Sequence, residues 1–269
     1  MFNSHVHTYF SPDSTESPEA MCRAAIDRNM CGIAFTDHAS LDSYILDNAY
    51  RNILNSCEAA RSLNEKFSSL KVLSGVEISE VTRKPDYASR LIKATNPDTV
   101  LLSVHTAVIN SKPVYFSKIN FSAMEAGEIY SLLKNYFRDV YNSVTSADFD
   151  ILAHLTHPFY FINGKAHKNI PAHDFYGDIE KIFSVVIEKG KSLEVNTSKL
   201  NSDYNMLMPS EDLIRVYRQM GGTLISLGSD AHEKENLDLG FEETKEFLKK
   251  IGFNSYVYYE KRKPFKISL

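Results

Sequence analysis

FNSHVHT, residues 2–8, places His5 and His7 two positions apart in a short segment with the composition of a β-strand. Side chains at positions i and i+2 of a strand project from the same face, so one metal ion can contact both histidines. Two polar side chains at a solvated strand end give the same pattern without an ion, and a short motif is only a hypothesis. The rest of the chain decides between a metal site and a polar strand end.

Six further runs of apolar and β-branched residues follow this stretch, and segments with helical periodicity separate them. The runs are CGIAFTDH, LKVLSGVEIS, TVLLSVHT, DILAHLTHP, KSLEVNTS and GTLISLGSDAH. Ser17 and Pro18 are residue types that begin helices, and the helical segments SEDLIRVYRQMGG and GFEETKEFLKKIG end in glycine. Strands that alternate with helices form parallel sheets. Seven such units predict an α/β fold that closes into a barrel.

The competing architecture is an open, doubly wound sheet, which usually carries a Gly-rich phosphate-binding turn after its first strand. No such turn follows residues 2–8, so the barrel is favoured. The chain has no linker rich in Pro, Gly or Ser, and residues 1–269 are therefore predicted to form a single domain. Residues 159–177 are the longest stretch without a clear period, which is typical of loops that cover or line a binding site.

Composition limits the classes of function open to the chain. Hydrophobic residues make up 43% and charged residues 24% of the sequence, as in ordinary soluble proteins, and the net charge of −4 disfavours nucleic acid as a partner. The three cysteines are odd in number and lack C-x-x-C spacing, which favours a reducing compartment. No apolar run reaches the roughly 18 residues of a membrane span, and no leader-like segment precedes His5. We therefore expect a cytoplasmic protein without a membrane partner.

Residues that bind metals stand at the carboxyl end of nearly every predicted strand. They are His5, His7, His38, Glu77, His105, His154, Asp230 and His232, and Asp13 lies in the loop after the first strand. In a parallel barrel these strand ends meet on one rim, where active sites form. Imidazoles and carboxylates without a thiolate suit zinc, manganese or iron, and ligands from so many strands can hold more than one ion. The sequence therefore predicts a multinuclear metal site.

The same segments resemble, in order, the motifs of a known family. HVH, TDH at 36–38, GVEIS, LLSVHT, AHL at 153–155, LEVNTS at 193–198 and GSDAH at 228–232 are similar to the successive motifs of the PHP (polymerase and histidinol phosphatase) superfamily. The likeness is greatest to its histidinol-phosphatase type and covers nearly the whole chain. It implies a distorted (β/α)7 TIM-like barrel that holds three divalent metal ions.

The resemblance also implies a role for each ligand. One ion would be held by His5, His7, Glu77 and Asp230, a second by Glu77, His105 and His154, and a third by Asp13, His38 and His232. Three divalent ions outweigh three carboxylates, which suits a phosphate monoester because its second pKa of about 6 makes it mostly dianionic at pH 7. A hydroxide that bridges the ions would attack phosphorus. Asp230, His157 or a metal-bound water would then return a proton to the leaving group.

Residues after the sixth predicted strand are candidates for substrate binding. Asn196, Thr197 and Ser198 resemble the family's NTSG segment and are predicted to orient the phosphate or the metal ligands. The chain then departs from the family, because Lys199 replaces the glycine and the arginines usual in histidinol phosphatases are absent from this segment and from AHLTHPFYF. The candidates for a phosphate contact are instead Lys199, Lys165, Lys168 and Arg83, although lysine is a point charge and not a bidentate fork. Asp37 fits two roles equally well, support of a ligand histidine or a purely structural one.

We therefore expect a metal-dependent phosphomonoesterase that converts L-histidinol phosphate to L-histidinol and inorganic phosphate in histidine biosynthesis. One alternative is a PHP phosphoesterase that acts on another small phosphate ester or on nucleotide or oligonucleotide ends. The acidic net charge and the absence of an extended basic run stand against oligonucleotides. A second alternative is a non-catalytic metal-binding PHP module, which predicts missing ligands, whereas all nine positions carry a metal-binding side chain. The sequence leaves open the native metal and the oligomeric state.

Overall fold

The computed structural model describes residues 1–40 and 46–269. Within them, seven parallel strands follow one another around a nearly closed barrel in the order β1, β2, β4, β5, β8, β9 and β10. Their bounds are Phe2–Val6, Gly32–Phe35, Lys71–Ser79, Thr99–Ser103, Ile151–Leu152, Ser192–Asn196 and Ile225–Gly228. Each strand lies in one of the seven predicted runs. The prediction of a distorted (β/α)7 barrel is confirmed.

The barrel is distorted at two places that matter for the site. Strand β3 (His38–Ser40) continues the direction of β2 and pairs with the last part of β4, so that His38 lies opposite Glu77. Among the described residues, the backbone hydrogen bonds that join β1 to β10 lie beyond the end of β10, where His7 N donates to Ala231 O at 2.9 Å and Asp230 N donates to His5 O at 2.9 Å. This closure joins the first and last metal-binding segments of the sequence.

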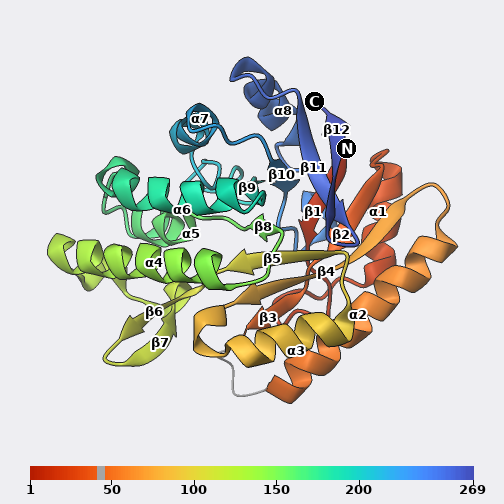
Figure 1. The fold of residues 1–269 in the computed structure, drawn as a ribbon, viewed down its shortest axis with the longest axis horizontal. Helices are drawn as coiled ribbons and strands as arrows, with labels where there is room; N and C mark the ends of the chain where they lie inside the picture. The colour runs from red at the N-terminus through yellow and green to blue at the C-terminus, as the bar shows by residue number, and fades with distance from the viewer. Residues whose placement is uncertain (41–45) are drawn as a thin grey trace.

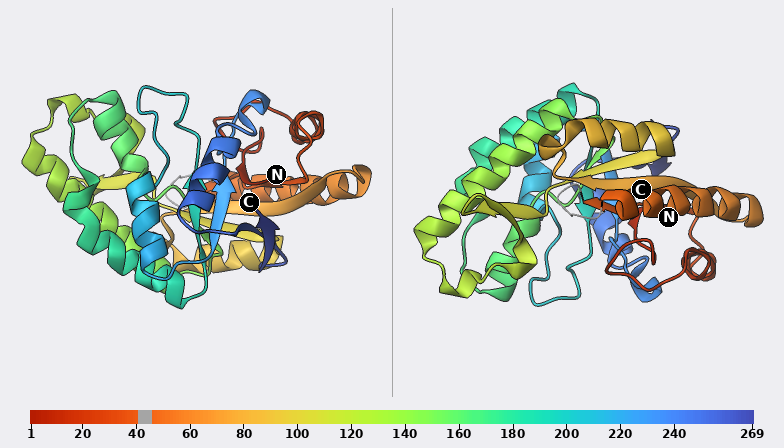
Figure 2. Two further views of the ribbon diagram at one scale, coloured as in Figure 1. Left: turned by 90° about the horizontal axis from the view of Figure 1, so that it is seen from above. Right: turned by 90° about the horizontal axis from the view of Figure 1, so that it is seen from below.

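The helices lie outside the strands (Figures 1 and 2). They are α1 (Pro18–Asp27), α2 (Leu46–Lys66), α3 (Pro85–Thr95), α4 (Ala126–Ser146), α6 (Tyr176–Glu188), α7 (Glu211–Gln219) and α8 (Phe241–Lys250). The predicted helix start is confirmed, because Ser17 Oγ accepts a hydrogen bond from Ala20 N at 3.1 Å and Pro18 takes the first position. Gly221 and Gly252 follow α7 and α8 with φ of +93° and +92°, which only glycine adopts freely. None of the described helices has the length and apolar character that a membrane span requires.

An antiparallel hairpin that the sequence did not predict covers the amino-terminal end of the barrel. Its strands are β11 (Ser255–Glu260) and β12 (Lys263–Ser268), beside the amino terminus in Figure 1. Tyr256 Oη accepts a hydrogen bond from Phe2 N at 2.8 Å, and Val257 packs against Leu101 and Ile151 inside the barrel. The open end is therefore the carboxyl end of the strands.

Two insertions border that open end. A second hairpin, β6 (Thr106–Ile109) and β7 (Lys112–Tyr115), follows β5 directly. The stretch predicted as a long irregular loop is instead folded into short helical turns over His157–Phe159, Tyr160–Lys165 and Ala172–Phe175. Phe159 and Phe175 of these turns are buried against Phe137 of α4, which explains why the stretch is ordered.

Candidate metal centre

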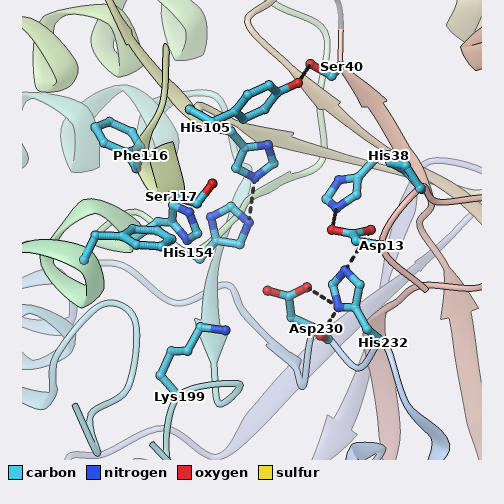
Figure 3. Close-up of a pocket in the computed structure, with 14 residues that line it drawn as sticks. Asp13, His38, Ser40, His105, Phe116, Ser117, His154, Lys199, Asp230 and His232 are labelled. Carbon is cyan, nitrogen blue, oxygen red and sulfur yellow. Dashed lines mark hydrogen bonds and ion pairs between the residues drawn. The ribbon is translucent and has the colours of Figure 1, made fainter. Parts of the chain in front are cut away.

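All nine predicted ligands come together at the carboxyl end of the barrel. His5 lies in β1, His7 follows it, and the others come from β3, β4 and the segments after β5, β8 and β10; Asp13 reaches the cluster from the loop after β1. Figure 3 shows His38, His105, His154, Asp230 and His232 around one space, with Asp13 between two of the histidines. Ligands separated by more than two hundred residues in the sequence thus face each other.

Glu77 lies at the centre of the cluster and is completely buried. Its Oε1 lies 2.8 Å from His154 Nε2 and 3.1 Å from His105 Nε2. The other oxygen, Oε2, lies 2.7 Å from His38 Nδ1 and 3.5 Å from His5 Nε2. Burial alone would raise the pKa of Glu77, but the surrounding histidines hold it well below the usual range. One ionised carboxylate therefore offers an oxygen to each of two groups of imidazoles.

The rings of His5 and His7 are oriented by hydrogen bonds that leave one nitrogen of each free for a cation. His5 Nδ1 donates to Glu194 Oε1 at 2.6 Å, and His7 Nδ1 donates to Ser11 Oγ at 3.0 Å. His5 Nε2 and His7 Nε2 then face each other at only 3.0 Å. Although burial lowers it, the pKa of His5 is raised well above its usual value by Glu194, Asp230 and Glu77, so a proton on His5 Nε2 can fill the space between the two nitrogens. These residues fit a bound cation that takes the place of that proton.

The outer part of the cluster lies at the rim. Asp13 Oδ1 lies 3.3 Å from His232 Nε2, and Asp13 Oδ2 lies 3.5 Å from His38 Nε2. His232 Nδ1 donates to Asp230 O at 2.9 Å, which leaves its Nε2 as the nitrogen that faces Asp13. Asp230 Oδ1 lies 3.2 Å from His7 Nε2 and so connects the rim to the buried part. Four groups of three ligand atoms, each within 4.8 Å of one another, can be drawn from the cluster.

Glu194 supports the cluster from within β9 and was not predicted from the sequence. In addition to its contact with His5, its Oε2 accepts hydrogen bonds from His154 N at 2.7 Å and from Asn196 Nδ2 at 3.2 Å. Gly228 makes room for this arrangement, because a Cβ there would lie 2.1 Å from Glu194 Oε1 and 2.7 Å from His5 Cβ. A charged residue inside the buried run SLEVN was the signal that the sequence offered.

Asp37 supports His7 through a serine. Its carboxylate accepts hydrogen bonds from Thr8 N, Thr8 Oγ1, Ser11 Oγ and Ser56 Oγ at 2.6–2.9 Å. Because the Ser11 hydroxyl donates to Asp37, its oxygen accepts from His7 Nδ1 and from His38 N. Of the two roles left open for Asp37, the geometry favours support of the ligand histidines.

A cavity of about 300 Å³ opens beside the cluster. Its lining combines side chains of the cluster, such as His38, His105 and His232, with the aromatic side chains of Tyr115, Phe116 and Phe161 (Figure 3 labels Phe116). A second, more polar cavity of about 680 Å³ shares Asp13, Lys199, Asp230 and His232 with the first. One of the two cavities beside the cluster is therefore lined in part by aromatic side chains, and the other mainly by polar ones.

The predicted substrate-binding residues take different positions. Lys199 lines both cavities, and Ser198 lines the second. The Asn196 amide is buried and donates to Glu194 and, at 3.4 Å, to Asp230. Thr197 is buried with its N–H and hydroxyl on Gly228 O, and Arg83 donates to Thr106 Oγ1 at 2.9 Å. Neither Thr197 nor Arg83 lines these two cavities, so their placement offers no support for the predicted phosphate contact.

His157, one of the three predicted proton donors, lines the first cavity. Its ring centroid lies 5.1 Å from that of His154 and 5.1 Å from that of Phe161. Burial, together with the positive charges of His154, His105 and Lys199, lowers the pKa of His157 well below its usual value. The ring is therefore neutral, with one N–H to donate, and its Nδ1 has no hydrogen-bond partner among the described residues.

Comparison with known proteins gives one consistent picture. The PHP domain family model matches residues 3–198. "Probable histidinol-phosphatase" of Clostridium acetobutylicum is 26% identical over 97% of this chain and 98% of its own, and histidinol-phosphatase of Lactococcus lactis is 25% identical over 93% and 91%. The crystal structure of histidinol phosphate phosphatase from Lactococcus lactis, complexed with zinc, L-histidinol and phosphate, superposes with a TM-score of 0.78 at 22% identity and covers 98% of each chain.

Proposed function

The chain belongs to the PHP family, and from this premise we propose that it is a metal-dependent phosphatase that hydrolyses L-histidinol phosphate to L-histidinol and phosphate. The observation that carries the proposal is the cluster of nine ligands around Glu77, beside a cavity of substrate size. The names of the full-length relatives and the zinc, L-histidinol and phosphate in the Lactococcus lactis complex support the choice of substrate.

We propose three divalent cations, of zinc, manganese or iron. His5, His7, Glu77 and Asp230 would hold the first, Glu77, His105 and His154 the second, and Asp13, His38 and His232 the third. The 3.0 Å approach of His5 Nε2 to His7 Nε2 and the contact of Glu77 Oε1 with both His105 and His154 support the first two groups. When bound, such ions polarise a phosphate ester and help a water molecule to lose its proton near neutral pH.

The chain's own residues then bind the substrate and move protons. Lys199 would contact a phosphate oxygen, because it reaches into both cavities beside Asp230 (Figure 3), and Ser198 would donate a second hydrogen bond. Asp230, at the boundary between cluster and cavities, would accept the proton of the attacking water. Asp230 would then pass this proton to the leaving oxygen, and the neutral ring of His157 would donate a hydrogen bond to that oxygen without giving up its N–H proton.

The aromatic side of the first cavity suits the leaving group. Tyr115, Phe116 and Phe161 line this cavity together with residues of the cluster, and the imidazole of histidinol can pack against such rings. The second, polar cavity would leave the side of the site that holds the attacking water open to solvent.

We further propose that residues 1–269 form one catalytic domain. The family match ends at residue 198, yet Asp230 and His232, which follow β10, complete the cluster. The last part of the chain is therefore required for the site.

The proposal is tested by phosphate release from L-histidinol phosphate, p-nitrophenyl phosphate and a 5′-phosphorylated oligonucleotide by the protein loaded with zinc or manganese. We expect the highest kcat/KM with L-histidinol phosphate. A higher value with p-nitrophenyl phosphate would favour another small ester, and a higher value with the oligonucleotide would favour a nuclease-like activity. Retention of metal after loading, with no hydrolysis of any of the three, would favour the non-catalytic metal-binding module.

A further inference from the structure

Glu80 is a buried carboxylate just beyond the end of β4, three residues after Glu77, and it lies outside the ligand set. Its Oε1 accepts three hydrogen bonds, from His105 N at 2.6 Å, Thr106 N at 3.1 Å and Thr106 Oγ1 at 3.2 Å. These donors belong to the two residues that follow β5 and begin β6. Glu80 therefore connects the carboxyl ends of β4 and β5.

Two features of Glu80 are unfavourable for folding on their own. Its φ is +55°, a left-handed conformation that costs energy in a residue with a side chain. Its Oε2 is buried and has no hydrogen-bond partner among the described residues, although unpaired buried polar atoms are costly. Strain and burial of this kind persist where the surrounding structure requires them, which points to a specific task for this side chain.

The role of Glu80 follows from the side chain of His105, whose backbone N–H it binds. His105 Nε2 lies 3.1 Å from Glu77 Oε1 and 3.4 Å from His154 Nε2, so a small shift of the His105 backbone separates three ligand atoms. Glu77 lies in β4 and Glu80 directly follows it. Glu77 contacts the ring of His105, and Glu80 accepts a hydrogen bond from the backbone N–H of His105. Hydrogen bonds to an ionised acceptor are shorter and stronger than neutral ones, which suits a carboxylate for this position.

We propose that Glu80 is a positioning residue that holds His105 in place for the cation shared by Glu77, His105 and His154. This inference rests on the metal centre of the proposed function. Glu80 belongs to none of the ligand groups found among the described residues, its Oε1 is occupied by the backbone of residues 105 and 106, and it lines neither cavity.

The chain offers a matched control for Glu80 at the opposite end of the same two strands. Asp98, directly before β5, accepts hydrogen bonds from Ser74 N at 3.0 Å and Ser74 Oγ at 2.8 Å in β4. It thus joins β4 to β5 as Glu80 does, at the end away from the metal-binding residues. A change at Asp98 removes the same kind of connection without touching His105.

The experiment measures bound zinc per chain by elemental analysis, and zinc affinity by competition with a chelator, for wild type, Glu80→Gln, Asp98→Asn and His105→Ala. Glu80→Gln keeps one oxygen that can accept from residues 105 and 106, but it removes the charge that strengthens these hydrogen bonds. We expect it to weaken the affinity of one zinc ion by about 10-fold, the low end of the range for a group that orients a ligand. His105→Ala should weaken the same ion, and adding Glu80→Gln to it should cause no further loss. Asp98→Asn should bind zinc as wild type does.

Wild-type zinc binding in Glu80→Gln, with only a lower melting temperature, would overturn the inference and leave a structural role. A fall in Asp98→Asn equal to that in Glu80→Gln would overturn it as well. If Glu80→Gln does not fold, the same measurement on Glu80→Asp, which keeps the charge but shortens the reach, decides the question in the same way. A wild-type protein that binds no zinc would refute the metal centre itself, and that result is distinguishable from a failure confined to Glu80.

Discussion

At the scale of single residues, some buried carboxylates belong to the cluster of predicted ligands, and others hold the side chains of that cluster in position. Glu77 belongs to the first kind, and Glu194 and Asp37 belong to the second. Glu194 fixes the tautomer of His5 and the backbone of His154 at once. Loss of such a group affects metal affinity more than it affects folding, because the histidines themselves remain.

Replacement of Glu194 by glutamine tests this division. The amide cannot accept at both positions, since one of its two ends is a donor, so either His5 Nδ1 or His154 N loses its partner. We expect metal affinity to fall by about 10- to 100-fold. Ser192→Ala, at the other end of β9, loses only the contact of Ser192 Oγ with Tyr259 Oη and should bind metal as wild type does. Equal metal affinities in wild type and Glu194→Gln would contradict the role given to Glu194.

Lys199 is the residue at which this chain departs most clearly from the family's phosphate-binding pattern. If its ammonium meets a phosphate oxygen, Lys199→Ala loses a charge-assisted hydrogen bond of about 1.5–3 kcal/mol, which corresponds to roughly 10- to 100-fold in kcat/KM. Lys199→Arg should recover part of the loss. Lys165 makes a good control, because it also lies over the Tyr160 ring, at 5.4 Å against 4.9 Å for Lys199, but lines neither cavity beside the cluster. Steady-state kinetics in which both alanine variants lose activity equally would argue against a specific phosphate contact.

At the scale of elements, the sequence was informative where apolar runs and ligand types coincide. All seven barrel strands were predicted from their apolar runs, and nearly every run ends in a residue of a metal-binding type, which parallel strands bring together at one end of the barrel. The hairpin β11–β12 was not predicted, because Tyr, Glu and Lys side chains in YVYYEKRK do not distinguish a buried cover from a solvated tail. The orientation of the Thr197 side chain could not be predicted from the sequence either, since its contact with Gly228 depends on the pairing of β9 with β10.

The hairpin β11–β12 is attached to the barrel by an ion pair at its turn. Arg262 Nε donates to Asp150 Oδ2, and its Nη2 donates to Asp148 Oδ1 at 2.9 Å. Asp150 is completely buried and also accepts from Val100 N at 2.9 Å. Arg262→Ala leaves this carboxylate without its main partner, with Lys191 Nζ 3.6 Å away as the remaining cation.

We expect Arg262→Ala to lower the free energy of unfolding by about 3 kcal/mol, the low end of the range for breaking a buried ion pair, because Lys191 compensates in part. Urea denaturation measures the change. The metal content should remain that of wild type, since the turn lies at the end of the barrel opposite the cluster. Arg262→Ala/Asp150→Asn should be more stable than Arg262→Ala alone because the unpaired charge is gone. A single variant as stable as wild type would show that the turn does not hold the hairpin.

At the scale of the whole molecule, the proposed metal centre lies where the first and last strands of the barrel are joined. Strands β1 and β10 make their only backbone hydrogen bonds among the described residues at His7 N to Ala231 O and Asp230 N to His5 O, within the ligand cluster. A cation between His5, His7 and Asp230 would therefore join the first and last strands at the place where two backbone hydrogen bonds connect them. Binding of the ions stabilises the folded chain only, because the ligands are scattered along the unfolded one.

Removal of the metal should accordingly open the barrel at this point before it unfolds the rest. For one ion at a thousand times its dissociation constant, linkage predicts about 4 kcal/mol of stabilisation, so EDTA should lower the unfolding midpoint markedly. Amide hydrogen exchange locates the change, and we expect the His7 and Asp230 N–H groups to lose protection while the β4–β5 pairs, such as Ile78 with Leu102, keep theirs. His5→Ala, which lacks a central ligand, should respond less to EDTA than wild type. Melting curves that coincide with and without the chelator, in a protein shown to have held metal, would mean that the barrel closes without the ions.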